Sequence, residues 1–421
     1  MAGSNTGVST QINAESKALA PFTHCYGHSL SLALKDVFKK MENPVLSNSL
    51  DFAHEITKLI KFSPKRQAIF DKLKETCADV QGVPGIRTMC PTRWTVKGTS
   101  CKSILDNYNI LARAWEICLS EPIDSETKAR ILGVNVTMQS FDFFFGLHLS
   151  CKIFMLSDNL SATLQQTKLC ASEGRRIAML TVETFKKMRT DESFALWWET
   201  VSKLAEDTGI VKEPTLPRKR KAPKRFEEGS SDTYHFYNSP LEYYRSVYFH
   251  AVDTVIQTIQ QRLDQPGRNQ LEMLEQLILS DEPTQSNLAL LKSKYPEDIN
   301  SDLLECQLLL FRQMTEENSA TSIEDIVVAL QSFSSVARSS ISEVMKVLKL
   351  LLLSPATNAV SERSFSSMRR LKTYLRSTMT QNRLNHIALL SIHSNRTTQL
   401  SPDRVITEFC KYHEYRRKLF G

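Results

Sequence analysis

Residues 350–393 constrain the fold of this chain more than any other stretch, because they predict two consecutive amphipathic helices. The first should begin near Ser354-Pro355, where a serine side chain can cap free N–H groups and proline fits the first turn. Its apolar residues recur at spacings of three and four, at Phe365, Met368, Leu371 and Leu375. A second helix, from about Gln381, places four apolar residues on one face: Leu384, Ile387, Ala388 and Ile392. Both faces must be buried, either against the rest of the chain or against a second copy of it.

The whole chain is expected to be mainly α-helical. Its 421 residues include 13 glycines, about half of what the usual ~7% would give, and leucine-rich periodic runs recur along it. The hydrophobic share of 41% and the charged share of 24% are ordinary for a globular protein, and the length allows two or three cores.

Several classes of protein are not indicated. The sequence contains no uncharged apolar run long enough for a membrane-spanning helix, and its start lacks the pattern of a secretory signal. The nine cysteines are scattered without framework spacing, which is typical of reduced thiols in the cytosol or nucleus. Glycine-rich nucleotide-binding motifs and the local signature of a serine hydrolase are also missing from the sequence.

Positive charge is concentrated at the C-terminal end. From residue 355 onward there are 12 Lys+Arg against 4 Asp+Glu, a surplus of +8, so the first 354 residues carry −1 of the total +7. Such an end suits contact with nucleic acid or an acidic partner, or it is a solvated basic surface. A second basic run, residues 212–225, holds three prolines and seven basic residues. It predicts an exposed linker that is also shaped like a nuclear-import signal.

Two short motifs are candidates for chemistry. His24-Cys25-Tyr26-Gly27-His28 contains a Cys-x-x-His pair, half of a zinc site, but no second close pair follows, so a packed histidine and thiol at a helix start is the expected structure. Cys90-Pro91-Thr92-Arg93-Trp94 precedes a predicted helix. Its Arg-Trp pair could stack on a base beside a phosphate, and the alternative is a tryptophan buried as a core anchor.

Core positions are expected in two apolar blocks. The core candidates are Phe141, Phe143, Phe144, Phe145, Leu147 and Leu149, then Leu196, Trp197 and Trp198. A further apolar stripe is formed by Val344, Val347, Leu348, Leu351 and Leu352.

The stretch PATNAVSERSFSSMRRLKTYLRSTM, residues 355–379, resembles the C-terminal dimerisation region of hAT-superfamily DNA transposases. The stretch also resembles domesticated members, such as those of the zinc finger MYM-type group and the 52 kDa repressor of the inhibitor of the protein kinase. The resemblance implies a nuclear protein that forms a homodimer or hetero-associates through these helices, with DNA as a further partner and no membrane or small-molecule substrate. The implied dimerisation residues are Phe365, Met368, Leu371, Leu375, Leu384 and Ile387.

Both short motifs also resemble elements of this superfamily. HCYGHSLSLAL is similar to its Cys-x-x-His element, which implies that His28 lies beside the active site and helps to hold DNA. CPTRW is similar to its Arg-Trp motif, whose tryptophan stacks on a flipped base. The implied DNA-binding residues are therefore His28, Arg93 and Trp94.

The resemblance implies a truncated RNase H-like core, with one short strand around Phe22–Cys25, interrupted by a large helical insertion. The predicted segments are 1–45 (core remnant with the Cys-x-x-His helix), 46–211 (helical insertion), 212–235 (basic proline-rich linker), 236–335 (second part of the insertion), 336–400 (dimerisation region) and 401–421 (basic tail).

Catalysis by such an enzyme needs three carboxylates that hold two metal ions. By resemblance Glu362 is the third carboxylate, whereas the first two aspartates would stand before Met1. We therefore expect no enzymatic activity and no cofactor, with Mg²⁺ required only by an intact full-length enzyme; Glu362 is then a surface carboxylate paired with Ser366 or Arg369. Asp36, Asp51, Asp142 and Asp158 lie in contexts unlike the family's aspartates.

Two alternative functions remain open at this point. The chain could be a fragment of an active transposase, whose missing aspartates are encoded upstream. It could also be a nuclear DNA-binding regulator that uses Arg93, Trp94 and the basic end.

Overall fold

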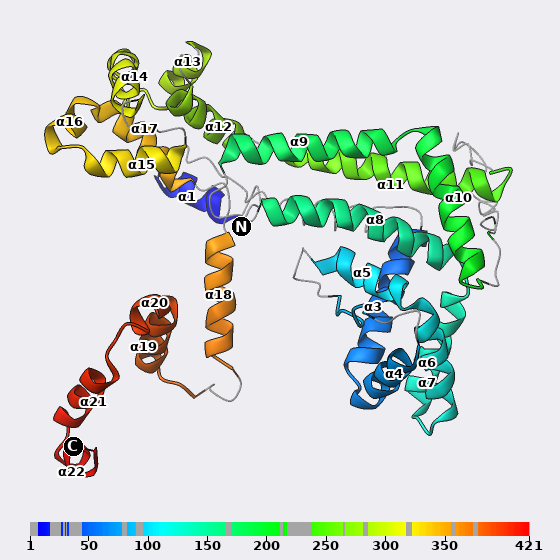
Figure 1. Ribbon diagram of the computed structural model, residues 1–421. Coiled ribbons are helices and arrows are strands. Elements are labelled where there is room, and N and C mark those ends of the chain that lie inside the picture. The colour runs from blue at the N-terminus through cyan, green and yellow to red at the C-terminus, as the bar shows by residue number, and fades with distance from the viewer. Residues whose placement is uncertain are drawn as a thin grey trace. The chain divides into compact units, whose positions relative to one another are not determined.

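The structure is a computed structural model, in which every regular element of the described residues is an α-helix (Figure 1). The described residues are 7–16, 27, 30, 32, 44–77, 82–89, 96–164, 170–210, 214, 216, 237–263, 266–280, 285–316, 322–354, 359–373 and 378–420. The prediction of a mainly helical chain is thereby confirmed, while the strand expected around Phe22–Cys25 lies outside the described residues. The chain divides into two compact units, unit 1 (Met1–Thr357) and unit 2 (Asn358–Gly421).

The helices of unit 1 have the following bounds: α1 (Val8–Ser16), α3 (Pro44–Lys61), α4 (Pro64–Thr76), α5 (Lys97–Asp106), α6 (Tyr108–Ser120), α7 (Ser125–Met138), α8 (Phe141–Thr163), α9 (Ala171–Met188), α10 (Asp191–Asp207), α11 (Pro240–Leu263), α12 (Pro266–Leu279), α13 (Gln285–Lys294), α14 (Ser301–Glu316), α15 (Ile323–Ser332), α16 (Ser335–Ser340) and α17 (Ser342–Leu353). Unit 2 contains α18 (Ala359–Leu371), α19 (Gln381–Ile392), α20 (Ser394–Thr397), α21 (Pro402–Lys411) and α22 (Glu414–Phe420).

The longest apolar helix, α8, forms the centre of unit 1 and packs against α3, α5, α9 and α10. It begins where the Ser140 side chain accepts a hydrogen bond from the N–H of Phe143, which satisfies one of the free N–H groups of the first turn. The predicted block is confirmed, since all six of its apolar residues are at most 4% exposed: Phe141, Phe143, Phe144, Phe145, Leu147 and Leu149. A helix that is apolar on several sides has to be enclosed by its neighbours, as α8 is.

Helices α3 and α8 approach each other most closely at Gly146. A methyl group added to Gly146 would lie 2.8 Å from the Val45 carbonyl oxygen and also against Ser49. The Ser49 hydroxyl donates a 2.6 Å hydrogen bond to the Val45 oxygen within α3, so this polar group is satisfied at the crossing. Glycine at position 146 thus allows the two helix backbones to come together.

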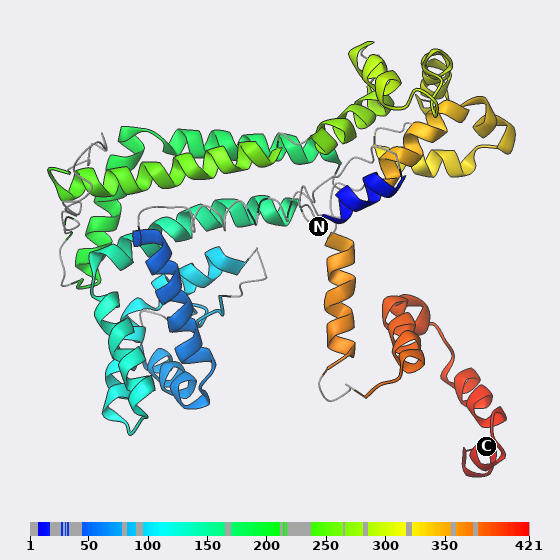
Figure 2. The ribbon, with the colours of Figure 1, turned by 180° about the vertical axis from the view of Figure 1, so that it is seen from behind.

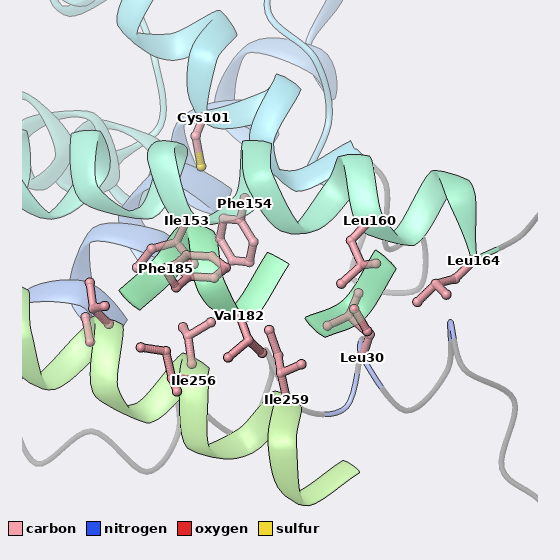
Figure 3. Packing of buried hydrophobic residues seen from close by; sticks show 14 of the residues in the cluster. Leu30, Cys101, Ile153, Phe154, Leu160, Leu164, Val182, Phe185, Ile256 and Ile259 are labelled. Carbon is pink, nitrogen blue, oxygen red and sulfur yellow. The ribbon is translucent and has the colours of Figure 1, made fainter. Parts of the chain in front are cut away.

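Helices α8, α9 and α11 share one layer of the core. Figure 3 shows their side chains meeting, with Ile153, Phe154 and Leu160 from α8, Val182 and Phe185 from α9, and Ile256 and Ile259 from α11. In both ribbon views α9 and α11 run side by side (Figures 1 and 2). The Arg189–Asp253 ion pair, at 2.7 Å, joins the two at the α10 end.

An aromatic cluster joins α10 and α11 to α8. The Phe145 ring lies 4.7 Å from the rings of both Trp197 and Tyr244, measured between centroids. The burial predicted for Trp197 is confirmed and Trp198 is half-buried, but the prediction for Leu196 is wrong, because its side chain is 68% exposed. Leu196 precedes two tryptophans on a helix, so its side chain points away from the face that they occupy.

The bundle of α12 to α17 is held to α9 by a buried carboxylate. Glu275 of α12 is 3% exposed, and its oxygens accept hydrogen bonds from the N–H groups of Ala171 and Ser172, the latter at 2.8 Å. These are two of the N–H groups that the first turn of a helix leaves without a helical partner. Arg175 of α9 adds an ion pair with Glu272 of α12 at 3.3 Å.

The cysteines of the described part are all free thiols. Across the same residues, no helix combines the length and apolar character that a bilayer-spanning segment requires.

Candidate self-association surface

Helix α17, which lies inside the predicted dimerisation region 336–400, is a core element of unit 1. Four residues of its stripe are at most 6% exposed and lie against α12 and α14: Val344, Val347, Leu348 and Leu351. The last residue of the stripe, Leu352, is not covered in the same way, because its side chain is 54% exposed. The backbone N–H of Ser354 bonds to the Leu351 oxygen at the end of α17. Pro355, the other half of the predicted helix start, lies outside the described residues.

A buried carboxylate fixes the beginning of α17. Glu343 is 6% exposed, accepts a 3.0 Å hydrogen bond from the N–H of Asn300 and forms a 2.9 Å ion pair with Lys346. Burial works against the charged form, but Lys346 and the Asn300 N–H outweigh it and lower the pKa of Glu343 below its ordinary value. Glu343 therefore ties α17 to the segment that precedes α14.

The next helix, α18, exposes its apolar stripe. Phe365 is 68% exposed and Met368 is 43% exposed, while Leu371 is half-buried. Leu375, the last predicted member, lies outside the described residues. Phe365, Met368 and Leu371 recur at the predicted spacing, and among the described residues of unit 2 none covers the first two of these side chains.

Helix α19 begins at Gln381, as predicted, and packs against α18. Leu384 is 7% exposed, and Ile387 and Ala388 are half-buried, so the face predicted to be buried is partly buried. The prediction for Ile392 is wrong, because it is 66% exposed. Two further apolar residues, Leu389 at 60% and Leu390 at 49%, are exposed as well. We name the five exposed side chains of this helix pair the α18–α19 surface: Phe365, Met368, Leu389, Leu390 and Ile392.

Residues 401–421, predicted only as a basic tail, form two further helices, α21 and α22. The Ser401 hydroxyl accepts a hydrogen bond from the N–H of Arg404, and Pro402 occupies the first turn of α21. This is the same serine–proline signal that the sequence analysis used at Ser354-Pro355. Applied at position 401, it would have identified α21.

The predicted chemical residues fall largely outside the description. His28, Arg93 and Trp94 are not among the described residues, so their predicted roles stay predictions. Glu362 belongs to α18, but its side chain is likewise outside the described part. Asp142 accepts a hydrogen bond from the Tyr244 hydroxyl. Across the described residues, no group of three or more His, Cys, Asp or Glu is placed to hold a metal ion.

Asp158 is the carboxylate with the most perturbed environment among the described residues. It is 8% exposed, and its Oδ2 accepts a 2.9 Å hydrogen bond from the N–H of Gly98 at the start of α5. Burial raises its pKa to about 6, although the Gly98 N–H and the ammonium group of Lys97 oppose the rise. Asp158 thus joins α8 to the first turn of α5, and sequence reasoning had found no role for it.

We expect the Asp158→Asn variant to gain stability relative to the wild type as pH rises from about 4 to 6.5. The unfolded carboxyl group ionises near 3.8 whereas the folded one ionises near 6, so ionisation penalises the folded state progressively between these values. The full penalty is on the order of 2–3 kcal/mol. Urea unfolding of the wild type and of Asp158→Asn at about pH 4, 5.5 and 7.5 measures this penalty. Asp106→Asn, which removes an exposed carboxylate of α5, is the control for the change in charge. Parallel pH profiles for wild type and Asp158→Asn would contradict this assignment.

Comparison with known families places the helices of this surface. Residues 314–396 match the hAT family C-terminal dimerisation region. The match runs from the end of α14 to α20, and therefore includes α17 and the α18–α19 surface but not α21 or α22. Over these residues the chain is similar to the C-terminal dimerisation region of the hAT family.

Proposed function

We propose that this chain is a hAT-transposase-derived protein whose activity is protein dimerisation through about residues 340–400. The observation that carries the proposal is the coincidence of two findings. The matched dimerisation region contains α18 and α19, and these two helices leave Phe365, Met368, Leu389, Leu390 and Ile392 exposed. Exposed apolar side chains gathered on two small helices are typical of a surface that a protein partner covers.

The experiment is the mass of the purified full chain in solution. Sedimentation equilibrium at micromolar concentration should show a dimer, with a fraction that rises with concentration. A strict monomer over the range from about one to fifty micromolar would overturn the proposal, because mass action should populate the dimer as the concentration rises.

A finer identity is part of the proposal. The sequence stretch 355–379 supports a domesticated member similar to the zinc finger MYM-type group, with remnants of an RNase H-like core and its helical insertion. Upstream genomic sequence tests this: an open reading frame that encodes the family's first aspartates would support the alternative, a fragment of an active transposase.

We further propose that these 421 residues do not cleave DNA by themselves. Two divalent ions need several oxygen ligands in fixed geometry, and Glu362 is the single carboxylate in a context similar to the family's. A nicking assay with Mg²⁺ tests it. Strand cleavage that disappears in Glu362→Ala would contradict the proposal.

DNA affinity and a nuclear location complete the proposed function. Unit 2 supplies the observation that favours DNA, because Arg369, Arg370 and Lys372 of this basic unit are exposed. Binding through phosphates releases counterions, so the affinity for a random duplex should fall steeply between about 50 and 200 mM salt. The steepness of this fall reports the number of contacts between basic side chains and phosphates. The basic run 212–225 supports nuclear import, which imaging of a fluorescent fusion with and without that run would test.

A further inference from the structure

Helix α21 has one apolar face and one polar face. Its apolar residues recur at helical spacing and stay exposed, with Val405 at 52%, Ile406 at 51% and Phe409 at 46%, and Tyr412 just beyond the helix at 80%. The polar residues occupy the other half of the helical turn: Asp403, Arg404, Thr407, Glu408 and Lys411. A helix with such a clean division is normally stabilised by burying its apolar side, and here that side is open within unit 2.

Helix α22 folds back on α21 without closing this face. The Phe409 and Phe420 rings meet edge-on at 6.2 Å, and the Arg416 guanidinium lies 4.4 Å above the Phe409 ring. Cys410 is the one residue of α21 that is buried, at 8% exposure. The second helix even adds to the open surface, because Tyr415, Leu419 and Phe420 are each more than half exposed.

We infer that the helical hairpin of residues 402–420, the α21–α22 hairpin, is a second part of the self-association surface, and that a second copy of this chain covers it. The inference rests on the proposed function and extends it beyond the matched dimerisation region, which ends at residue 396. It assigns a partner to the segment 402–420, which lies outside that region.

Continuity and charge favour a second copy over a nucleic acid. The hairpin begins six residues after the matched region ends, so a partner bound along α18 and α19 is within reach of it. The open face of α21 consists of apolar and aromatic side chains, and one basic group, the Arg416 guanidinium of α22, lies over its Phe409 ring, whereas a surface for phosphates would carry several lysine or arginine residues there. Its polar face is charge-balanced, with Asp403 and Glu408 against Arg404 and Lys411, and Lys411 pairs with Glu408 at 2.8 Å. Two such helices can therefore pair about a two-fold axis, each presenting the same patch to the other.

The size of the surface sets the expected effect. Four aromatic side chains of the hairpin, each about half exposed or more, offer on the order of 400 Å² per protomer. A standard interface buries about 800 Å² per partner, so the hairpin alone is too small for a stable dimer. The α18–α19 surface must supply the remainder, and a change in the hairpin should weaken the dimer without abolishing it.

The test compares Val405→Asp with Thr407→Asp in the full chain. Both changes put one aspartate on α21, but position 405 lies on the apolar face and position 407 on the exposed polar face. Sedimentation equilibrium should give a dimer dissociation constant raised by about tenfold or more for Val405→Asp, and within about twofold of the wild type for Thr407→Asp. Ile406→Gln provides a second variant, because glutamine is a good helix former. Circular dichroism should confirm that both variants are folded.

Each other outcome has a definite meaning. An unchanged dissociation constant for folded Val405→Asp and Ile406→Gln overturns the inference, and the proposed function survives if Phe365→Asp still weakens the dimer. A lower melting temperature at constant dissociation constant would show that the chain covers this face itself, which also overturns it. If the wild type is a monomer, both the inference and the proposed function fail.

Discussion

Replacement of Phe365 by aspartate is expected to raise the dissociation constant of the dimer by about 100-fold or more. Phe365 is the most exposed side chain of the α18–α19 surface, at 68%, and it lies inside the matched dimerisation region. In the dimer its ring would be desolvated, and truncation of a central aromatic residue typically costs at least about 2 kcal/mol. An unpaired carboxylate in the same place adds the cost of removing a charge from water. Sedimentation equilibrium of the full chain measures the change.

Ser366→Asp is the matched control for this experiment. It places the same charge one residue further along α18, on the side opposite to the stripe of Phe365, Met368 and Leu371, and Ser366 is exposed. Dimerisation of this variant should stay within about twofold of the wild type. Equal weakening by both variants would mean that charge on α18, and not its apolar stripe, controls association.

Phe145→Ala should lower the free energy of unfolding by about 3–5 kcal/mol. The Phe145 ring is fully buried on α8 and touches the rings of Trp197 and Tyr244, which come from two different helices. Loss of the ring removes its transfer free energy and leaves a cavity that rigid aromatic neighbours cannot fill. Urea unfolding followed by tryptophan fluorescence reads this directly.

Leu196→Ala provides the comparison within the same cluster. Leu196 stands next to Trp197 on α10, but its side chain is 68% exposed, so its truncation should change stability by less than about 0.5 kcal/mol. Similar losses for Phe145→Ala and Leu196→Ala would show that α10 packs differently from the structure described above.

Local sequence rules predicted the helices and most of the core, because both depend on patterns within a few residues. The apolar block around Phe145, the start of α19 at Gln381 and the stripe of α17 all follow from spacing and composition. The failures come from the ends of apolar runs. Leu196 and Leu352 each stand beside a buried residue, and Ile392 lies one turn beyond the half-buried Ala388. All three are outside the arc that a neighbouring helix covers, and this arc is set by tertiary packing.

The polar connections could not be predicted, because their partners are distant in the chain. Asp158 bonds to a residue 60 positions away, and Glu275 bonds to residues 103 and 104 positions away. No local motif marks either carboxylate. The α21–α22 hairpin was not predicted for a different reason: the segment was interpreted as a tail because of its positive charge. The Ser401-Pro402 pair and the spacing of Val405 and Phe409 nevertheless indicate a helix in the sequence.

The clamp that Glu275 forms on α9 sets the axial register of two helices. One carboxylate grips two successive main-chain groups, so α9 cannot slide along α12 by even one residue without breaking both bonds together. Helix α12 in turn packs on α17, which belongs to the matched dimerisation region. A force exerted on α17 by an associated partner would therefore be transmitted through α12 to α9, because the two Glu275 hydrogen bonds prevent α12 and α9 from sliding past each other.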